Sequence, residues 1–467
     1  MKYVSTRGAA PTLEFADVLL EGLATDGGLY VPEEWPALPA LAPAAPYAAV
    51  AFEVMWPFVS GSIDPESFRS IVADTYATFH PPAGSSPDVV PLHEVGDGLS
   101  VAELFWGPTL AFKDIALQLL GRLFDWELDR RQSRVTIVGA TSGDTGSAAI
   151  DACRDRDHID IFILHPLGRT SDVQRKQMTT VLSPNVHNVA IEGTFDDCQD
   201  LVKALFADEV FRRSQQLSAV NSINWARVMA QVVYYVTTAR AIAPAGSPVS
   251  FCVPTGNFGN IFAAYGALRM GLDIDQLLIA SNTNDILTRF FNTGHMEIRA
   301  VAPTLSPSMD IQVSSNLERL LFDMVGRDGG AVADLLTRFR SEGEVAIDDE
   351  RLGWLSEHLS AGELDDEQCL AEIGATYRDS GYLMDPHTAV GVGVARRLRR
   401  VGADVPMVCM GTAHPAKFPD AVERATSVRP ELPEHLADLF DRPERFDTLP
   451  ADLDVVRRYV SDRTVTH

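Results

Sequence analysis

The chain has 467 residues, of which 46% are hydrophobic and 22% are charged, a balance typical of a globular protein with roughly two to four domains. The formal net charge of −25 argues against non-specific binding to nucleic acids or anionic membranes. No apolar run reaches the length of a membrane span, and the first residues lack the apolar core of a signal peptide, which predicts a cytoplasmic protein. The five cysteines form no CxxC pair, so neither a metal site nor a disulfide framework is expected.

The first hundred residues are rich in Pro, Gly and Ala. Residues 38–46 and 80–87 have the composition of linkers or surface loops, and helical patterns occupy residues 51–59 and 65–78. We therefore expect a small N-terminal accessory domain over residues 1–95.

A lysine heads the apolar face of a helix predicted to begin near residue 113. From Lys113, the apolar residues Leu117, Leu120 and Phe124 follow at helical spacing, which is the pattern of a buried stripe. The opposite face is expected to be solvated and carries Asp114, Gln118, Arg122, Asp125 and Asp129.

Strands and helices alternate from residue 134 onward. This rhythm predicts an α/β architecture with mainly parallel sheets. A small α/β domain is expected over residues 133–221, and a large domain over residues 96–132 and 222–467, with an acidic helical periphery at 330–385. The expected strands are 134–138, 159–164, 186–191, 249–253, 276–281 and 405–410, and the expected helices are 172–181, 196–211, 224–242 and 261–270.

Two glycine-rich turns join a predicted strand to a predicted helix, at residues 139–146 and 254–260. Unpaired amides at the start of a helix bind anions. The first turn has neither the ending of a Walker loop nor the spacing of a dinucleotide fingerprint. Each could also use its glycines only for close packing, but two such turns at the carboxyl ends of strands favour a binding site.

Lysine is rare in this chain, which narrows the search for a reactive amine. Lys113 is the best candidate, because burial and the positive end of a helix dipole both favour a neutral amine. Lys417 is the one serious competitor, and a snorkelling side chain is the ordinary alternative. A neutral amine suits a Schiff base with an aldehyde cofactor that also carries a phosphate. The five lysines are Lys2, Lys113, Lys176, Lys203 and Lys417.

Several long motifs, in order along nearly the whole chain, closely resemble the threonine synthase family of the long bacterial and fungal type. They are "YVSTRG" (3–8), "DGGLYVPEEWP" (26–36), "GPTLAFKD" (107–114), "GATSGDTGSAAI" (139–150), "PTGNFGN" (254–260), "SPSMDIQVSSNLERLLF" (306–322), "DPHTAVGVG" (385–393) and "GTAHPAKF" (411–418). The resemblance implies a fold-type-II enzyme dependent on pyridoxal 5'-phosphate (PLP), similar to the tryptophan synthase β chain. Two open, mainly parallel sheets flanked by helices are then expected.

The resemblance also implies roles for individual residues. Lys113 would form the Schiff base with PLP, and Thr412 would face the pyridine nitrogen. The cofactor phosphate would be held by Gly256, Asn257, Phe258 and Gly259. The substrate carboxylate would be held by Ser142, Gly143, Asp144 and Thr145. Candidates for the leaving phosphate are Arg175, Lys176, Ser314, Ser315, Asn316 and Arg319. His387 and His414 lie in matching motifs, and we assign them no role.

The reaction implied is the conversion of O-phospho-L-homoserine and water to L-threonine and phosphate, by γ-elimination followed by β-addition of water. That is the last step of threonine biosynthesis, and the enzyme would be a carbon–oxygen lyase acting on phosphate. A serine or threonine dehydratase, or another type II PLP lyase, is the nearest alternative. A non-catalytic PLP-binding homologue is the alternative from another class. The expected partner is a small molecule, with no nucleic acid, membrane or metal, and the protein is expected to be a monomer or homodimer.

Overall fold

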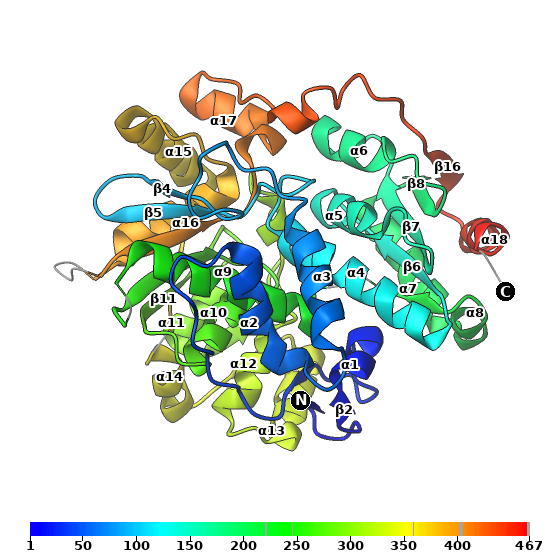
Figure 1. Cartoon of the computed structure of the whole chain (residues 1–467), viewed down its shortest axis with the longest axis horizontal. Coiled ribbons are helices and arrows are strands. Elements are labelled where there is room, and N and C mark those ends of the chain that lie inside the picture. Colours follow the sequence, from blue (N-terminus) through cyan, green and yellow to red (C-terminus); the bar gives the residue numbers. More distant parts are fainter. Residues whose placement is uncertain (220–221, 245, 358, 401–404, 465–467) are drawn as a thin grey trace. The chain divides into compact units, whose positions relative to one another are not determined.

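The computed structural model describes residues 1–219, 222–244, 246–357, 359–400 and 405–464, and they form two compact units (Figure 1). Unit 1 consists of residues 1–106 and 222–430, and unit 2 of residues 107–221 and 431–467. Within the described ranges, no helix is long and apolar enough to cross a membrane.

Unit 1 begins with a three-stranded antiparallel sheet in the order β2-β1-β3. Its core continues into the rest of the unit, because Tyr3 and Phe58 pack against Trp225, with ring centroids 5.9 and 5.6 Å apart. All three side chains are fully buried. The elements of this part are β1 (Lys2–Ser5), β2 (Leu13–Glu14), α1 (Phe15–Glu21), β3 (Tyr30–Pro32), α2 (Tyr47–Val59) and α3 (Pro65–Tyr76), and α9 (Trp225–Ile242) supplies Trp225.

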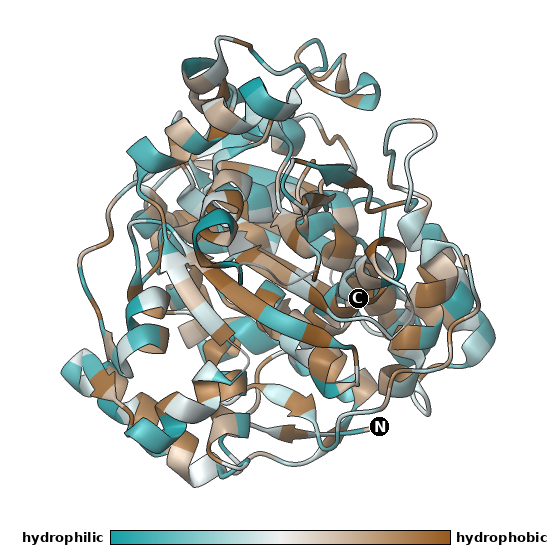
Figure 2. Ribbon diagram, turned by 90° about the vertical axis from the view of Figure 1, so that its left-hand side faces the viewer, coloured by the Kyte–Doolittle hydropathy of each residue, from teal (hydrophilic) through white to brown (hydrophobic). Residues whose placement is uncertain are grey.

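The main sheet of unit 1 has the strand order β14-β11-β10-β15-β5-β4, and every pair is parallel except β4 with β5. Its central strands β10 and β15 are buried along their length, as is usual for parallel strands covered on both faces. Figure 2 shows hydrophobic strands in brown among helices that carry both hydrophobic (brown) and hydrophilic (teal) residues. Parallel strands place their carboxyl ends at one edge, so the loops after β10 and β15 share that edge. The strands are β4 (Leu92–Glu94), β5 (Leu99–Glu103), β10 (Val249–Pro254), β11 (Ile274–Ser281), β14 (Leu359–Glu363) and β15 (Met407–Gly411).

Helices and short elements complete unit 1. They are α10 (Gly259–Arg269), α11 (Ile286–Thr293), β12 (His295–Glu297), η1 (Pro307–Met309), α12 (Leu317–Met324), α13 (Gly329–Glu342), β13 (Glu344–Ala346), α14 (Asp349–Ser356), α15 (Asp366–Ser380), α16 (Pro386–Leu398), η2 (Pro415–Lys417) and α17 (Pro419–Thr426). The segment expected to be helical at 330–385 also contains β14, which pairs with β11 as an edge strand of the main sheet, so the expectation of a purely helical periphery is wrong there.

Unit 2 is built on a parallel sheet in the order β16-β8-β7-β6-β9. One face packs against α7 and α18, and the other against α4 and α5. Its elements are α4 (Lys113–Arg131), β6 (Val135–Ala140), α5 (Asp144–Cys153), β7 (Ile159–Pro166), α6 (Asp172–Thr179), β8 (Val186–Glu192), α7 (Phe195–Ala207), α8 (Glu209–Ser214), β9 (Leu217–Ser218), η3 (Glu434–Leu436), β16 (Asp447–Pro450) and α18 (Leu453–Arg463). The expected α/β architecture with parallel sheets is confirmed.

The borders of the two units differ from the three domains expected from the sequence. Helix α4 was expected in the large domain, but a methyl group at Gly121 would lie only 2.3 Å from the carbonyl oxygen of Ala152 in α5, so the two helices are in close contact within unit 2. The C-terminal segment joins the same unit because β16 pairs with β8. The division into 1–95, 96–132 with 222–467, and 133–221 stays a prediction.

Helix α4 is also buried on more sides than its sequence suggests. Leu117, Leu120 and Phe124 are buried as expected. The expectation of a solvated opposite face is wrong for Asp114 and Gln118, which are 0% and 2% exposed. Gln118 donates to Asp151 at 2.6 Å, and Arg122 donates back to Gln118. Polar contacts between neighbouring helices therefore satisfy residues that an amphipathic pattern assigns to water.

Candidate functional site

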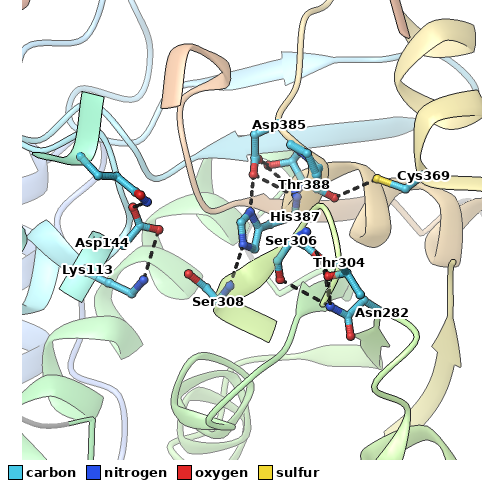
Figure 3. A network of polar contacts seen from close by, with 12 residues as sticks. Lys113, Asp144, Asn282, Thr304, Ser306, Ser308, Cys369, Asp385, His387 and Thr388 are labelled. Atoms are coloured by element: carbon cyan, nitrogen blue, oxygen red, sulfur yellow. Dashed lines mark hydrogen bonds and ion pairs between the residues drawn. The ribbon is translucent and has the colours of Figure 1, made fainter. Parts of the chain in front are cut away.

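Lys113 is the first residue of α4, and its side chain is buried in unit 2. Its Nζ lies 3.4 Å from Oδ2 of Asp144, the first residue of α5 (Figure 3). The other oxygen of Asp144 accepts a hydrogen bond of 2.9 Å from Gln174. Lys113 and Asp144 are 8% and 6% exposed. The predicted reactive lysine is thus buried and oriented by a carboxylate that is itself held by an amide.

The loop before Lys113 is held in a conformation unusual for its residues. Leu110 has φ +60, a left-handed conformation that costs free energy for a branched side chain. Its side chain is fully buried against Val173 and Leu439. The carboxylate of Asp114 accepts from the backbone N of Thr109 at 2.8 Å and from its hydroxyl at 2.6 Å. Packing and these bonds fix the direction from which the chain enters α4.

The first glycine-rich turn lies at the carboxyl end of β6. Its Thr141 hydroxyl accepts from the amides of Gly143 and Gly146, at 3.0 and 2.9 Å. Gly143 has φ +149, and a Cβ there would lie 2.4 Å from the side chain of Gln174, so only glycine fits. Ser142 is exposed and Thr145 is half-buried. The role of Ser142, Gly143, Asp144 and Thr145 as substrate ligands stays a prediction.

The second glycine-rich turn follows β10 at the carboxyl edge of the main sheet of unit 1. A Cβ on Gly256 would lie 2.6 Å from the carbonyl oxygen of Ser308. Phe258 has φ +64, and its ring is buried and stacks on Phe291 at 6.0 Å. Gly259 then begins α10. A tight turn leading into a helix N-terminus is the form of an anion cradle.

Thr412 lies at the same edge, directly after β15. Strands β10 and β15 pair in register from Ser250 with Met407 to Cys252 with Cys409, which brings the positions after both strands side by side. Thr412 is 6% exposed. The sheet therefore carries the predicted anion turn and the predicted hydroxyl ligand on neighbouring strand ends.

Asn260 was quoted in the motif but not chosen as a site residue. It is 6% exposed, and its Oδ1 accepts from the hydroxyls of Tyr234 and Tyr235. Its Nδ2 is buried and has no hydrogen-bond partner among the described residues. One end of the amide is therefore held by the two tyrosines, and its Nδ2 is left without a described partner beside the anion turn. In the sequence, the pair Gly259-Asn260 at the end of the motif could have indicated this residue.

Arg227 is the functional candidate that the sequence reasoning missed altogether. It lies in the first turn of α9, is 4% exposed, and forms no hydrogen bond or ion pair through its guanidinium with any residue that the structure describes. Burial lowers the pKa of Arg227 to about 10, which still leaves it charged at neutral pH. A buried cation without a protein partner is costly, so Arg227 is a candidate for binding an anion. In the sequence, Arg227 could have been recognised as the single charged residue near the start of the apolar run "WARVMAQVVYYV".

Arg175 and Lys176 lie on α6 and contact the C-terminal segment of unit 2. Both pair with Glu444, Lys176 at 3.1 Å, and Lys176 also donates to the carbonyl oxygen of Phe440 at 3.0 Å. These contacts give both cations a partner within the protein, so their role toward the leaving phosphate stays a prediction.

Ser315 and Asn316 lie just before α12, beside the second glycine-rich turn. The Ser315 hydroxyl lies 3.2 Å from that of Ser222. Asn316 is fully buried, and its Nδ2 donates to the carbonyl oxygen of Asn257 at 2.9 Å. Asn316 accepts from Arg319, which is fully buried too. The structure thus brings them to the anion turn in unit 1, while a direct contact with substrate stays a prediction.

The two histidines without an assigned role are built into unit 1 differently. His387 is 4% exposed; its Nδ1 lies 2.6 Å from Asp385, and its Nε2 accepts from the backbone N of Ser308 at 3.3 Å (Figure 3). The network thus supports Ser308, whose carbonyl oxygen lies 2.6 Å from the position that a Cβ on Gly256 would take. His414 caps η2, where it accepts from the backbone N of Ala416.

Lys417, the competing lysine, is also fully buried in η2. Burial alone therefore does not separate it from Lys113. Among the residues that the structure describes, no group of His, Cys, Asp and Glu is arranged to hold a metal ion.

Three family models match the chain. "Threonine synthase N terminus" matches residues 2–76, "Pyridoxal-phosphate dependent enzyme" matches residues 92–336, more than half of the chain, and "Threonine synthase, C-terminal" matches residues 388–460. The middle model contains both glycine-rich turns and Lys113.

Relatives and solved structures agree with these models. The chain is 54% identical to threonine synthase of Pseudomonas aeruginosa, covering 99% of this chain and 98% of that one, and 44% identical to that of Corynebacterium glutamicum, with the same coverage. The crystal structure of PLP-bound threonine synthase from Brucella melitensis superposes with a TM-score of 0.97 at 50% identity, covering 100% of both chains. The yeast threonine synthase gives 0.93 at 37% identity, covering 99% and 98%.

These similarities extend over the whole length and include the N-terminal and C-terminal parts. The expected fold-type-II architecture and the PLP cofactor are confirmed. The chain belongs to the threonine synthase family of pyridoxal-phosphate-dependent enzymes.

Proposed function

We propose that this chain converts O-phospho-L-homoserine and water to L-threonine and phosphate. Relatives that bear the name threonine synthase match it from end to end, which supports the same activity. The observation that carries the choice of a phosphorylated substrate is Arg227, a buried guanidinium with no partner among the described residues. Serine and threonine, the substrates of dehydratases, have no second anion beyond the carboxylate and do not call for such a cation.

The residues present fit the PLP cofactor. The amides of Asn257, Phe258 and Gly259 would bind its phosphate, since the turn is closed by Gly256 against Ser308 and tolerates no side chain there. The unpaired Nδ2 of Asn260 is a further donor of the right kind. Lys113 would hold the cofactor aldehyde through its amine, and Thr412 would place a hydroxyl at the ring nitrogen. When bound, PLP withdraws electrons from the α-carbon of the substrate.

Lys113 would then move protons at the substrate. Its amine removes the α-proton and later returns one, a role that a single base can serve in several steps. Asp144 orients Nζ from 3.4 Å, and Gln174 holds Asp144 in place. A buried amine held by a fixed carboxylate has few alternative positions, which favours a repeatable proton transfer.

Arg227 would bind the phosphate ester and stabilise the phosphate as it leaves. A desolvated guanidinium forms strong, charge-assisted hydrogen bonds with phosphate. Its position in the first turn of α9 adds the positive end of a helix dipole. Each candidate expected from the sequence already has a protein partner; these candidates are Arg175, Lys176, Ser314, Ser315, Asn316 and Arg319.

The reaction can be tested by the products formed from three substrates. We expect phosphate and threonine from O-phospho-L-homoserine, and little pyruvate or 2-oxobutanoate from serine or threonine. Keto-acid formation without phosphate release would identify a dehydratase instead. Cofactor absorbance with no turnover of any phospho-amino acid would support a non-catalytic homologue.

The attachment residue is tested separately by borohydride reduction and peptide mapping. A label on the peptide that contains Lys113 is expected. A label on Lys417, which is fully buried, would contradict the assignment.

A further inference from the structure

Two carbonyl groups of the second glycine-rich turn point toward one segment of unit 1. The hydroxyl of Ser314 donates to the carbonyl oxygen of Gly256. The carbonyl oxygen of Asn257 accepts two hydrogen bonds from Asn316, from its backbone N at 3.1 Å and from its Nδ2 at 2.9 Å. Two successive peptide groups of the turn are therefore held by residues 314–316.

This arrangement fixes where the amides of the turn point. In a trans peptide the N–H lies opposite the preceding carbonyl, and neither peptide is cis. The N–H groups of Asn257 and Phe258 therefore point away from residues 314–316. Together with the first amides of α10, they form the donor face of the cradle. Rotation of either peptide would put a carbonyl dipole where the phosphate is to bind.

Asn316 is itself locked in one orientation. Its Oδ1 accepts from Arg319, which can only donate, so the amide cannot be reversed. The second hydrogen of Nδ2 goes to the carbonyl oxygen of Ser222 at 3.1 Å. The side chain is 0% exposed, and all its hydrogen-bonding groups are used within unit 1.

Arg319 anchors this amide to two other parts of the unit. Its Nε donates to the carbonyl oxygen of Tyr30 at 3.0 Å, and Nη2 donates to that of Ile223. The guanidinium is fully buried, and burial lowers the pKa of Arg319 to about 9. A buried cation bound to backbone carbonyls at both flanks leaves Asn316 no freedom to turn.

We propose that Asn316, locked by Arg319, is a positioning residue that turns the peptides of residues 256–258 so that their N–H groups face the cofactor phosphate. The proposal rests on the cofactor site given above under the proposed function. It gives Asn316 a role through the turn, in place of the direct contact with the leaving phosphate expected from the sequence.

The test compares two ligands that differ only in the phosphate. Full-length apoenzyme is titrated with PLP and with pyridoxal, and binding is followed by the quenching of protein fluorescence. Asn316→Ala should weaken PLP binding at least about tenfold, because two peptides lose a fixed direction, and should change pyridoxal binding little. The ³¹P resonance of bound PLP should shift or broaden. Ser314→Ala, which frees only the first carbonyl, should give a smaller loss in the same direction.

Asn185→Ala is the matched control. Its Nδ2 also donates to backbone carbonyls, those of Cys153 and Ile159 at 2.8 Å each, but these belong to unit 2, whereas the turn belongs to unit 1. It should lose stability without losing affinity for PLP. Equal losses for PLP and pyridoxal in Asn316→Ala, or an unchanged affinity for PLP, would overturn the proposal. If Asn316→Ala does not fold, Ser314→Ala decides by the same comparison. A wild-type protein that binds pyridoxal as tightly as PLP would instead refute the cofactor site itself.

Discussion

Nζ of Lys113 lies 3.4 Å from Oδ2 of Asp144, and both side chains are buried. The sequence indicated burial and a helix start, which both favour a neutral amine. The carboxylate acts in the opposite direction, because a nearby negative charge stabilises the ammonium form. The position of Nζ is thus set by a carboxylate that opposes the effect of burial on the amine.

Replacing Asp144 by Asn should shift the reactivity of Lys113 to lower pH. The amide keeps the shape and the contact with Gln174 but removes the negative charge. We expect the rate at which apoenzyme takes up PLP to reach half its maximum at a lower pH than in the wild type, because the carboxylate that stabilises the ammonium form is gone. Asp129→Asn, on the exposed part of the same helix, is the control. An unshifted profile would show that the pair does not govern the amine.

Two glycine-to-alanine substitutions should change stability in opposite directions. A Cβ added at Gly121 would lie 2.3 Å from the carbonyl oxygen of Ala152. Gly121→Ala should therefore force α4 and α5 apart and lower the free energy of unfolding by about 1–3 kcal/mol. Gly353 lies in α14 with open space around it. Gly353→Ala should gain up to about 1 kcal/mol from helix propensity. Urea unfolding measures the change in the free energy of unfolding for each variant. Equal changes for the two variants would contradict the close contact between α4 and α5.

The sequence predicted what local patterns encode. The strands 159–164 and 249–253 were found within one or two residues, as β7 and β10, because buried parallel strands read as continuous apolar runs. Lys113 was chosen because it breaks an apolar stripe, and its burial agrees with that choice. Arg227 and Asn260 were missed because a polar residue lacks a partner only in three dimensions. The pairing of β16 with β8, more than 250 residues apart in the chain, has no local signal.

His165 should make the protein sensitive to mild acid. Its ring is 2% exposed, and neither nitrogen has a hydrogen-bond partner among the described residues. Burial lowers the pKa of His165 from 6.5. Below pH 6.5, His165 therefore binds a proton more readily in the unfolded chain than in the folded one. Stability is therefore present above pH 6.5 and is lost as the pH falls below it. In His165→Phe, the free energy of unfolding should change less between pH 7.5 and about 5.5, whereas His80→Gln, at an exposed position, should behave as the wild type.

Glu444 should stabilise the C-terminal segment of unit 2 at neutral pH. Despite some burial, hydrogen bonds from Arg175, Thr179 and Lys176 lower the pKa of Glu444 from 4.5 to about 2. Its contribution is thus complete above pH 4.5 and is lost as the pH falls toward 2. Glu444→Gln should cost about 1–2 kcal/mol at pH 7 and flatten the acid dependence. Limited proteolysis between residues 431 and 447 should speed up, while Glu431→Gln, an exposed neighbour, should have no such effect.

Replacing Arg227 by Met should make the protein more stable and less active. The wild-type guanidinium is buried without a partner among the described residues, and removing an uncompensated buried charge should gain about 1–3 kcal/mol. The same change removes the proposed phosphate ligand, so kcat/KM for O-phospho-L-homoserine should fall about 100-fold or more, and inhibition by inorganic phosphate should weaken.

Arg227→Lys separates charge from geometry. It keeps the cation but loses the planar fork, so it should retain part of the activity and gain little stability. The absorbance of bound PLP should be unchanged in both variants, because the cofactor phosphate is assigned to the turn at residues 256–259. A stable Arg227→Met variant with wild-type turnover would refute the role of Arg227. A parallel loss of stability and activity would mean instead that the guanidinium supports the fold.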